Sequence, residues 1–283
     1  MIEIKKQSLS ETFSIYLDKR MLKILLLGAI SGFPWVLIGS SLSLWLKEDG
    51  LSRSTVGWAG LIFAVYAFNY LWAPLIDRIQ IPYLTKKIGH RRGWIVLMQM
   101  LILMSLFLWS VIDPSENLAL VISVGLIIAI ASATQDITLD ALRIEQINEN
   151  EGKSMAAGAA MAVVGWWSGY KLGGVLSLFC ADFLENSGFQ NYWQLTFLIL
   201  GTLIILMNIG LLFVNETEAI NRQKNQKQND KLIADKFQNS NFLTKIITWV
   251  SGTISGPIIS FFKKNGFEIA LGILGFVFLF KVG

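Results

Sequence analysis

Apolar runs long enough to cross a bilayer recur along this chain, and they constrain its fold more than any other feature. A helix of about 20 apolar residues, at 1.5 Å per residue, spans the hydrocarbon core of a membrane. Runs near this length occupy 22–46, 55–77, 94–112, 118–141, 155–181 and 192–214, and a shorter run occupies 266–283. The sequence therefore predicts an all-α polytopic membrane protein, with a bundle of six helices and the start of a seventh span.

The segments between these runs predict four regions: a cytoplasmic tail at 1–21, the six-span bundle at 22–214, a cytoplasmic linker at 215–265 and the seventh span at 266–283. The linker begins with a stretch rich in Asn, Gln and Lys, which is typical of flexible connectors. Its apolar residues at 242–250 have helical spacing, and we expect this amphipathic part either to lie on the inner leaflet or to pack as a connector. Because the last run is short for a span, we expect the chain to be truncated.

Basic residues predict the orientation of the spans. All but four of the 24 lysine and arginine residues fall in segments that the six spans place on one side of the membrane. Cytoplasmic loops carry this excess of Lys and Arg, so the amino terminus is predicted to be cytoplasmic. The net charge of +4 thus follows from membrane topology, and nucleic acid is not an expected partner.

Several kinds of chemistry lack their usual residues in this sequence. Cys180 and His90 are each the single member of their type, so neither a disulfide framework nor a metal site is expected. A phosphate-binding GxxxxGK[ST] loop does not occur, and no nucleophile–base pair is evident. We therefore expect no cofactor and no enzymatic activity.

Polar residues occupy one face of the fourth predicted span. Gln135, Asp136, Asp140 and Arg143 follow a long uncharged run, and Asp136, Asp140 and Arg143 share one side of the helix. A carboxylate inside a bilayer costs roughly 2.5 to 3.5 kcal/mol unless it faces protein or water. Asp140 and Arg143 have ion-pair spacing and are expected to close the cytoplasmic end. For Gln135 and Asp136, a role in substrate or proton handling and a structural role both remain open.

The fifth predicted span adds an intramembrane cation. Its small residues form a stripe suited to close helix packing: Gly158, Ala162, Gly165, Gly169 and Gly173. Lys171 points away from this stripe and is too deep to reach the outer surface, so it is expected to face water or a carboxylate. Such a cation suits an anionic substrate. Tyr66 and Asn69 on the second span can add hydrogen bonds, although polar helix–helix contacts are the commoner role.

The loop after the second span is also charged. Asp77 and Arg78 end that span, and Arg91 and Arg92 follow across a short loop. These residues can form a network that holds a cytoplasmic gate in one state, or they can serve only as a positive-inside cluster. The loop resembles the signature loop of major-facilitator transporters, in which two halves of six helices flank a basic cytoplasmic link.

A closer resemblance covers nearly the whole chain. The segments that carry it are "GAISGFPWVL", "WAPLIDR", "GHRRGWIVLMQ", "SATQDITLDA", "GYKLGG", "PIISFFKKNG" and "FLFKVG". They are similar to segments of the AmpG muropeptide permease family, in the same order. The resemblance implies an inner-membrane secondary transporter that uses the proton motive force to import anhydromuropeptides. It places Gln135, Asp136 and Lys171 in family motifs and makes Gly32 with Pro34 the breakpoint of the first span.

The expected function is therefore proton-driven import of a small anionic solute, an anhydromuropeptide, across the bacterial inner membrane. Asn69 stands where some relatives carry lysine, so a related permease for another anionic solute, such as a peptide or coenzyme A derivative, is an alternative. A non-transporting membrane scaffold or an inactive half-transporter is the other. Since alternating access needs two halves, a missing carboxy-terminal half or a separate partner half is also expected.

Overall fold

The computed structural model describes residues 9–147, 150–216, 256 and 259–282, and within these ranges it contains helices but no strand. The chain divides into two compact units: Met1–Asn69 with Ile81–Ala219, and Tyr70–Gln80 with Ile220–Gly283. The second unit contains α6 (Ala73–Arg78) and α14 (Phe267–Val282).

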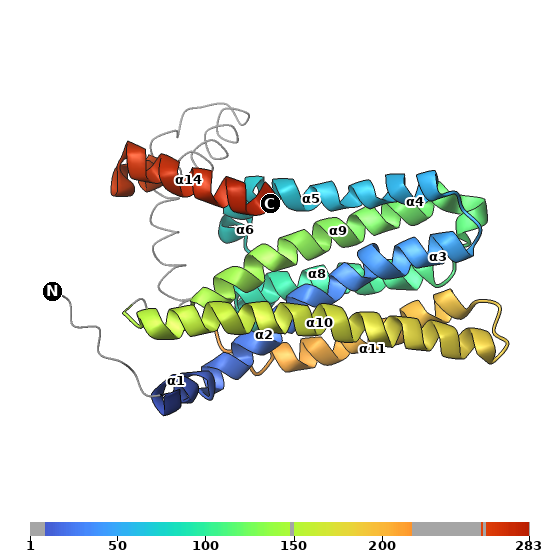
Figure 1. Ribbon diagram of the computed structural model, residues 1–283, viewed down its shortest axis with the longest axis horizontal. Helices are drawn as coiled ribbons and strands as arrows, with labels where there is room; N and C mark the ends of the chain where they lie inside the picture. Colours follow the sequence, from blue (N-terminus) through green and yellow to red (C-terminus); the bar gives the residue numbers. More distant parts are fainter. Residues whose placement is uncertain (1–8, 148–149, 217–255, 257–258, 283) are drawn as a thin grey trace. The chain divides into compact units, whose positions relative to one another are not determined.

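The first unit is a bundle whose long helices run side by side along its length (Figure 1). Its elements are α1 (Leu9–Tyr16), α2 (Lys19–Val36), η1 (Leu37–Ser41), α3 (Leu42–Glu48), α4 (Arg53–Ala59), η2 (Gly60–Ala64), α5 (Val65–Phe68), α7 (Leu84–Ile88), α8 (His90–Trp109), α9 (Pro114–Ile144), α10 (Gly152–Asn186) and α11 (Tyr192–Leu211), with η3 (Asn69–Leu71) at its boundary. The helix α1 falls within the segment predicted to be a tail.

Five helical stretches of the described chain are long and apolar enough to cross a membrane: Lys19–Glu48, Arg53–Leu71, His90–Trp109, Pro114–Ile144 and Tyr192–Leu211. The predicted span at 155–181 falls inside α10, which has 35 residues but is not among these five. The predicted seventh span corresponds to α14, an apolar helix of 16 residues. The amphipathic part of the linker, at 242–250, lies outside the described residues.

The second span ends earlier than predicted. Its helix stops at Leu71 instead of continuing to 77, and α6 starts separately at Ala73. Pro74 explains the break, because proline has no backbone N–H and its fixed φ suits the first turn of a new helix.

Close packing of α2 on α10 brings two backbones together. Gly165 and Gly169 of α10 face the backbone carbonyl groups of Leu25 and Ala29, and a Cβ atom at either glycine would overlap those oxygens. The glycine stripe predicted on the fifth span is thereby confirmed as a packing surface, and its partner is the first span.

The first span does not break at Gly32 and Pro34, contrary to the sequence prediction. The helix α2 continues through both residues, and its regular geometry changes to a π-helix only at η1. Gly32 instead allows close packing, since a Cβ atom there would overlap the carbonyl oxygen of Trp166. Glycine at this position therefore follows from the distance between the two helices.

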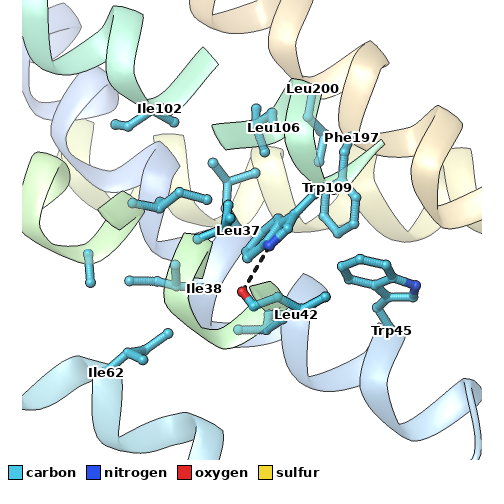
Figure 2. Close-up of a cluster of buried hydrophobic side chains, with 14 of the residues drawn as sticks. Leu37, Ile38, Leu42, Trp45, Ile62, Ile102, Leu106, Trp109, Phe197 and Leu200 are labelled. Atoms are coloured by element: carbon cyan, nitrogen blue, oxygen red, sulfur yellow. Dashed lines mark hydrogen bonds between the residues drawn. The ribbon is translucent and has the colours of Figure 1, made fainter. Parts of the chain in front are cut away.

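Large side chains fill the interior of the bundle at the end where α3 lies (Figure 2). Trp45, Trp109 and Phe197 are almost fully buried, and the ring of Phe197 lies 5.0 Å from each of the two indole rings. Buried indole groups need a hydrogen-bond partner, and the Nε1–H group of Trp109 donates to the carbonyl of Val121 at 3.0 Å.

Replacing Gly169 with leucine is expected to separate α2 from α10. The added side chain meets the backbone of Ala29, which cannot move aside as a flexible side chain could, and overpacking costs roughly 1 to 3 kcal/mol. Gly174→Leu on the same helix is the control, because nothing lies within 4 Å of a Cβ atom there. Heating the protein with a thiol-reactive dye that detects Cys180 should show a lower Tm for Gly169→Leu alone. Equal Tm values for the two variants would contradict the packing argument.

Candidate functional site

A cavity of about 340 Å³ lies between α2, α9 and α10 of the first unit. Its polar lining comes from the face of α9 that the sequence predicted to be functional, together with one serine of α2. The lining residues are Leu27, Gly28, Ser31, Asp136, Leu139, Asp140, Arg143, Ala159, Ala162, Val163 and Trp166. This cavity is the candidate site.

Asp136 is half-buried in the cavity wall. Its carboxylate accepts a 2.6 Å hydrogen bond from the hydroxyl of Ser31, which lies on α2. Tyr66, from α5, does not line the cavity. The charge-assisted hydrogen bond from Ser31 fixes the Asp136 carboxylate against the first span.

Gln135, beside Asp136, is fully buried and does not line the cavity. Its Nε2 amide donates to the backbone carbonyl of Ile30 at 2.9 Å. That carbonyl lies four residues before Pro34, which has no N–H group with which to complete the helical bond. The Gln135 side chain therefore satisfies a backbone group that the proline leaves open, and this contact accounts for its amide nitrogen without a substrate.

An aromatic cluster borders the cavity. Trp166 of α10 stacks on Tyr170, with ring centroids 5.5 Å apart and planes at 16°. The rings of Trp35, from α2, and Trp166 are nearly perpendicular at 73°, with centroids 5.6 Å apart, and the ring centroid of Tyr66 lies 4.5 Å from that of Trp35. These contacts join the first, second and fifth spans through rings whose orientation is fixed by their neighbours.

Lys171 lies on the exposed side of α10, as its position opposite the glycine stripe predicted. Its Nζ atom lies 5.4 Å from the ring centroid of Trp167 and 5.5 Å from that of Tyr170, which is the geometry of cation–π contacts. It does not line the cavity. Asn69 is half-buried at the start of η3 and does not line the cavity either.

A charged network lies at the beginning of α8. The Arg91 guanidinium pairs with the Glu145 carboxylate at 3.1 Å, and only 7% of either side chain is exposed. The Glu216 carboxylate accepts from the backbone N–H of Arg91 at 3.0 Å and of Arg92 at 3.4 Å, so it caps the helix. Gly89, with a φ of 103°, makes room for this carboxylate.

Three further ion pairs occupy the end of the bundle that the sequence predicts to be cytoplasmic. Asp140 and Arg143 pair at 3.0 Å, which confirms the spacing argument, while their part in gating stays a prediction. Arg20 bridges Asp18 at 2.8 Å and Glu151 at 3.0 Å, joining the starts of α2 and α10. Hydrogen bonds from Arg20 hold the pKa of the Asp18 carboxyl below its usual value.

Asp77 and Arg78 lie on α6, in the second unit. A gate formed by these two residues with Arg91 and Arg92 therefore stays a prediction. The sequence interpretation did not find Glu145 or Glu216. Their partners are 54 and 125 residues away along the chain, so no local spacing could have indicated either contact.

Comparison with known proteins indicates a membrane transporter, in agreement with the apolar spans. The family model of the Major Facilitator Superfamily matches residues 24–282. A putative transporter AmpG 4 of Rickettsia felis is 31% identical over 269 residues, which are 95% of this chain and 58% of the relative. The anhydromuropeptide permease of Escherichia coli is 32% identical over 196 residues, which are 69% of this chain and 38% of the relative.

The chain thus spans about half the length of the curated relatives that it matches. The apolar helices and the bacterial relatives together make it a multi-pass inner-membrane protein.

Replacing Gln135 with leucine should leave the Ile30 carbonyl without this donor, and losing a buried partner costs roughly 1 to 3 kcal/mol. In a Pro34→Ala background the alanine N–H can donate to the same carbonyl, so replacing Gln135 with leucine should cost less stability there. Thermal unfolding of the four proteins in this double-mutant cycle measures the coupling. Strictly additive losses would mean that the proline and the glutamine are unrelated.

Arg91→Ala should destabilise the protein by roughly 3 to 5 kcal/mol, because it removes the guanidinium that neutralises a buried carboxylate. The double variant Arg91→Leu with Glu145→Leu should recover part of the loss, since no charge is then buried. Lys86→Ala, at an exposed position on α7, is the control. Chemical or thermal unfolding of the four proteins gives the comparison, and a double variant as unstable as Arg91→Ala would refute the ion-pair explanation.

Proposed function

This chain belongs to the major facilitator superfamily as a relative of its AmpG-type permeases, and we propose that it imports anhydromuropeptides by proton-driven secondary transport. The substrate class is that named for the anhydromuropeptide permease of Escherichia coli, to which the chain is similar. Import would bring cell-wall fragments into the cytoplasm, with the amino terminus on the cytoplasmic side.

The observation that carries this proposal is the Asp136 carboxylate, half-buried in a cavity on a helix long and apolar enough to span the membrane. Ionisable groups at such positions are costly, and they recur in proton and substrate pathways. The Ser31 hydroxyl donates a 2.6 Å hydrogen bond to this carboxylate and so stabilises its charged form. Gaining or losing a proton at Asp136 would change this contact between α2 and α9, which links proton binding to helix packing.

Transport in this superfamily takes place between two six-helix halves that rock around a central site. The first unit is a helical bundle of the kind that forms one such half, and we propose that it acts together with a second half. The ion pairs at its cytoplasmic end, Arg91 with Glu145 and Asp140 with Arg143, would then stabilise one of the two gate states.

Lys171 is proposed to bind the anionic group of the substrate. Its exposed position on α10 leaves the ammonium group open to a carboxylate or phosphate, while Trp167 and Tyr170 fix its direction. A related permease for another anionic solute would use the same cation. Only a measurement of uptake distinguishes between the candidate substrates. A membrane scaffold requires neither Lys171 nor Asp136.

Uptake by the complete transporter that contains this chain tests the proposal. In cells that lack their own muropeptide permease, Lys171→Leu should lower uptake of labelled anhydromuropeptide by at least about tenfold, as for loss of one charge-assisted contact. Leu172→Ala, an exposed neighbour on α10, should transport normally.

Asp136→Asn should abolish uptake driven by a proton gradient and leave substrate exchange across the membrane intact, because exchange needs no net proton movement. Membrane expression must be equal for all variants. Normal uptake by both the Lys171 and the Asp136 variants would exclude their assigned roles. Absence of any muropeptide uptake by the unaltered protein would favour another solute or a scaffold.

A further inference from the structure

We infer that the cavity between α2, α9 and α10 binds a neutral, polyhydroxyl ring of the substrate, and that the anionic group of the substrate binds apart from it, at Lys171. This inference rests on the proposed function and divides its substrate between two subsites. We call the cavity lined by Ser31, Asp136, Asp140, Arg143 and Trp166 the ring subsite.

The charges of the ring subsite disfavour an anion. Two carboxylates, Asp136 and Asp140, line it against one guanidinium, Arg143, and the guanidinium already pairs with Asp140 at 3.0 Å. A carboxylate or phosphate placed here would meet like charges at short range. The anionic group of a substrate is therefore expected to bind at a different position.

A metal cation is also a poor fit for the ring subsite. Hard cations take about six to eight oxygen ligands, whereas most residues around this cavity are apolar or small. Within the described chain, no group of three or more His, Cys, Asp or Glu residues is placed to hold a metal ion. A neutral ligand agrees better with this mixed lining.

Hydroxyl groups match the polar atoms that are present. A hydroxyl donates one hydrogen bond and accepts others, a carboxylate only accepts, and a guanidinium only donates. Neighbouring hydroxyls on one ring can thus donate to Asp136 and Asp140 and accept from Arg143. Ser31 holds the Asp136 carboxylate in place, so this carboxylate does not have to be ordered when the ligand binds.

Trp166 supplies the apolar side of the ring subsite. It lines the cavity, and its contacts with Tyr170 and Trp35 fix its orientation before any ligand arrives. An aromatic wall beside a few polar groups is the usual composition of small-molecule pockets. The C–H groups of a sugar ring can pack on such a wall while its hydroxyls reach the carboxylates.

Lys171 follows Trp166 by five residues on α10, which corresponds to about 7.5 Å along the helix axis. Its ammonium group lies over Trp167 and Tyr170, outside the ring subsite. Five residues also turn the helix by about 140°, so Lys171 points from a different side of α10 than Trp166. A ligand that reaches both positions must therefore carry its anionic group on a flexible chain that extends from the ring around the side of α10. Trp166 would select for the ring, and Lys171 for the charge.

Binding of two probes to the purified full chain in detergent tests this division by calorimetric titration. Di-N-acetylchitobiose, a neutral disaccharide, should lose at least about tenfold in affinity with Trp166→Ala, as for removal of an aromatic anchor, and nothing with Lys171→Leu. An N-acetylmuramoyl dipeptide, which is anionic, should lose affinity with either change. Trp166→Phe keeps a ring and should bind better than Trp166→Ala. Phe179→Ala removes an exposed aromatic side chain on the same helix outside the cavity and is the matched control.

The inference is overturned if the unaltered chain does not bind the disaccharide, if Phe179→Ala weakens it as much as Trp166→Ala, or if Lys171→Leu weakens both probes equally. Failure of the proposed function gives a different result. In that case the disaccharide binds and responds to Trp166→Ala as expected, but the complete transporter shows no muropeptide uptake. Uptake without disaccharide binding would leave the proposed function in place and refute the ring subsite.

Discussion

Inside a bilayer, each backbone N–H and C=O group needs a partner within the protein, because lipid provides none. Pro34 has no N–H group to donate to the Ile30 carbonyl. The contact that replaces this hydrogen bond determines much of the site. The Ile30 carbonyl takes its hydrogen bond from Gln135 of α9, and the next residue on each helix, Ser31 and Asp136, forms the bond that holds the cavity carboxylate. The proline thereby fixes the pairing of two spans at the position where the carboxylate lies.

The same region of α2 contacts α10 on another side. Glycine at 28 and 32 brings the α2 backbone against α10 near Trp166, and glycine at 165 and 169 does the same from α10. Since the cavity is lined from α2, α9 and α10, its shape depends on both contacts of α2. Small residues in this bundle therefore control how close the polar groups come, as side-chain volume does in a soluble core.

Much of this arrangement could be predicted from sequence, because it follows from periodicity. Apolar length predicted the five long apolar stretches, the 3.6-residue repeat placed Asp136, Asp140 and Arg143 on one face, and the glycine repeat predicted the packing side of α10. Contacts between distant segments could not be predicted in this way. The partner of Arg91 proved to be Glu145, the amide of Gln135 bonds to Ile30, and Lys171 lies outside the cavity, because each depends on how whole helices pack. The helix runs through the expected breakpoint at Gly32 and Pro34, and its geometry changes only at η1.

The π-helical turn at η1 has a consequence for how the first span can change in evolution. A π-turn accommodates one residue more than the α-helical turn it replaces, so it is equivalent to a one-residue insertion absorbed locally. Deleting one residue between Leu37 and Ser41 would therefore return the span to a regular α-helix and leave the residues on either side in phase. Trp45 would then keep its side of the helix toward Trp109 and Phe197, and Ser31 its place beside Asp136. Single-residue deletions in this turn should thus be tolerated better than deletions in the regular part of α2, each of which would rotate all that follows by about 100°.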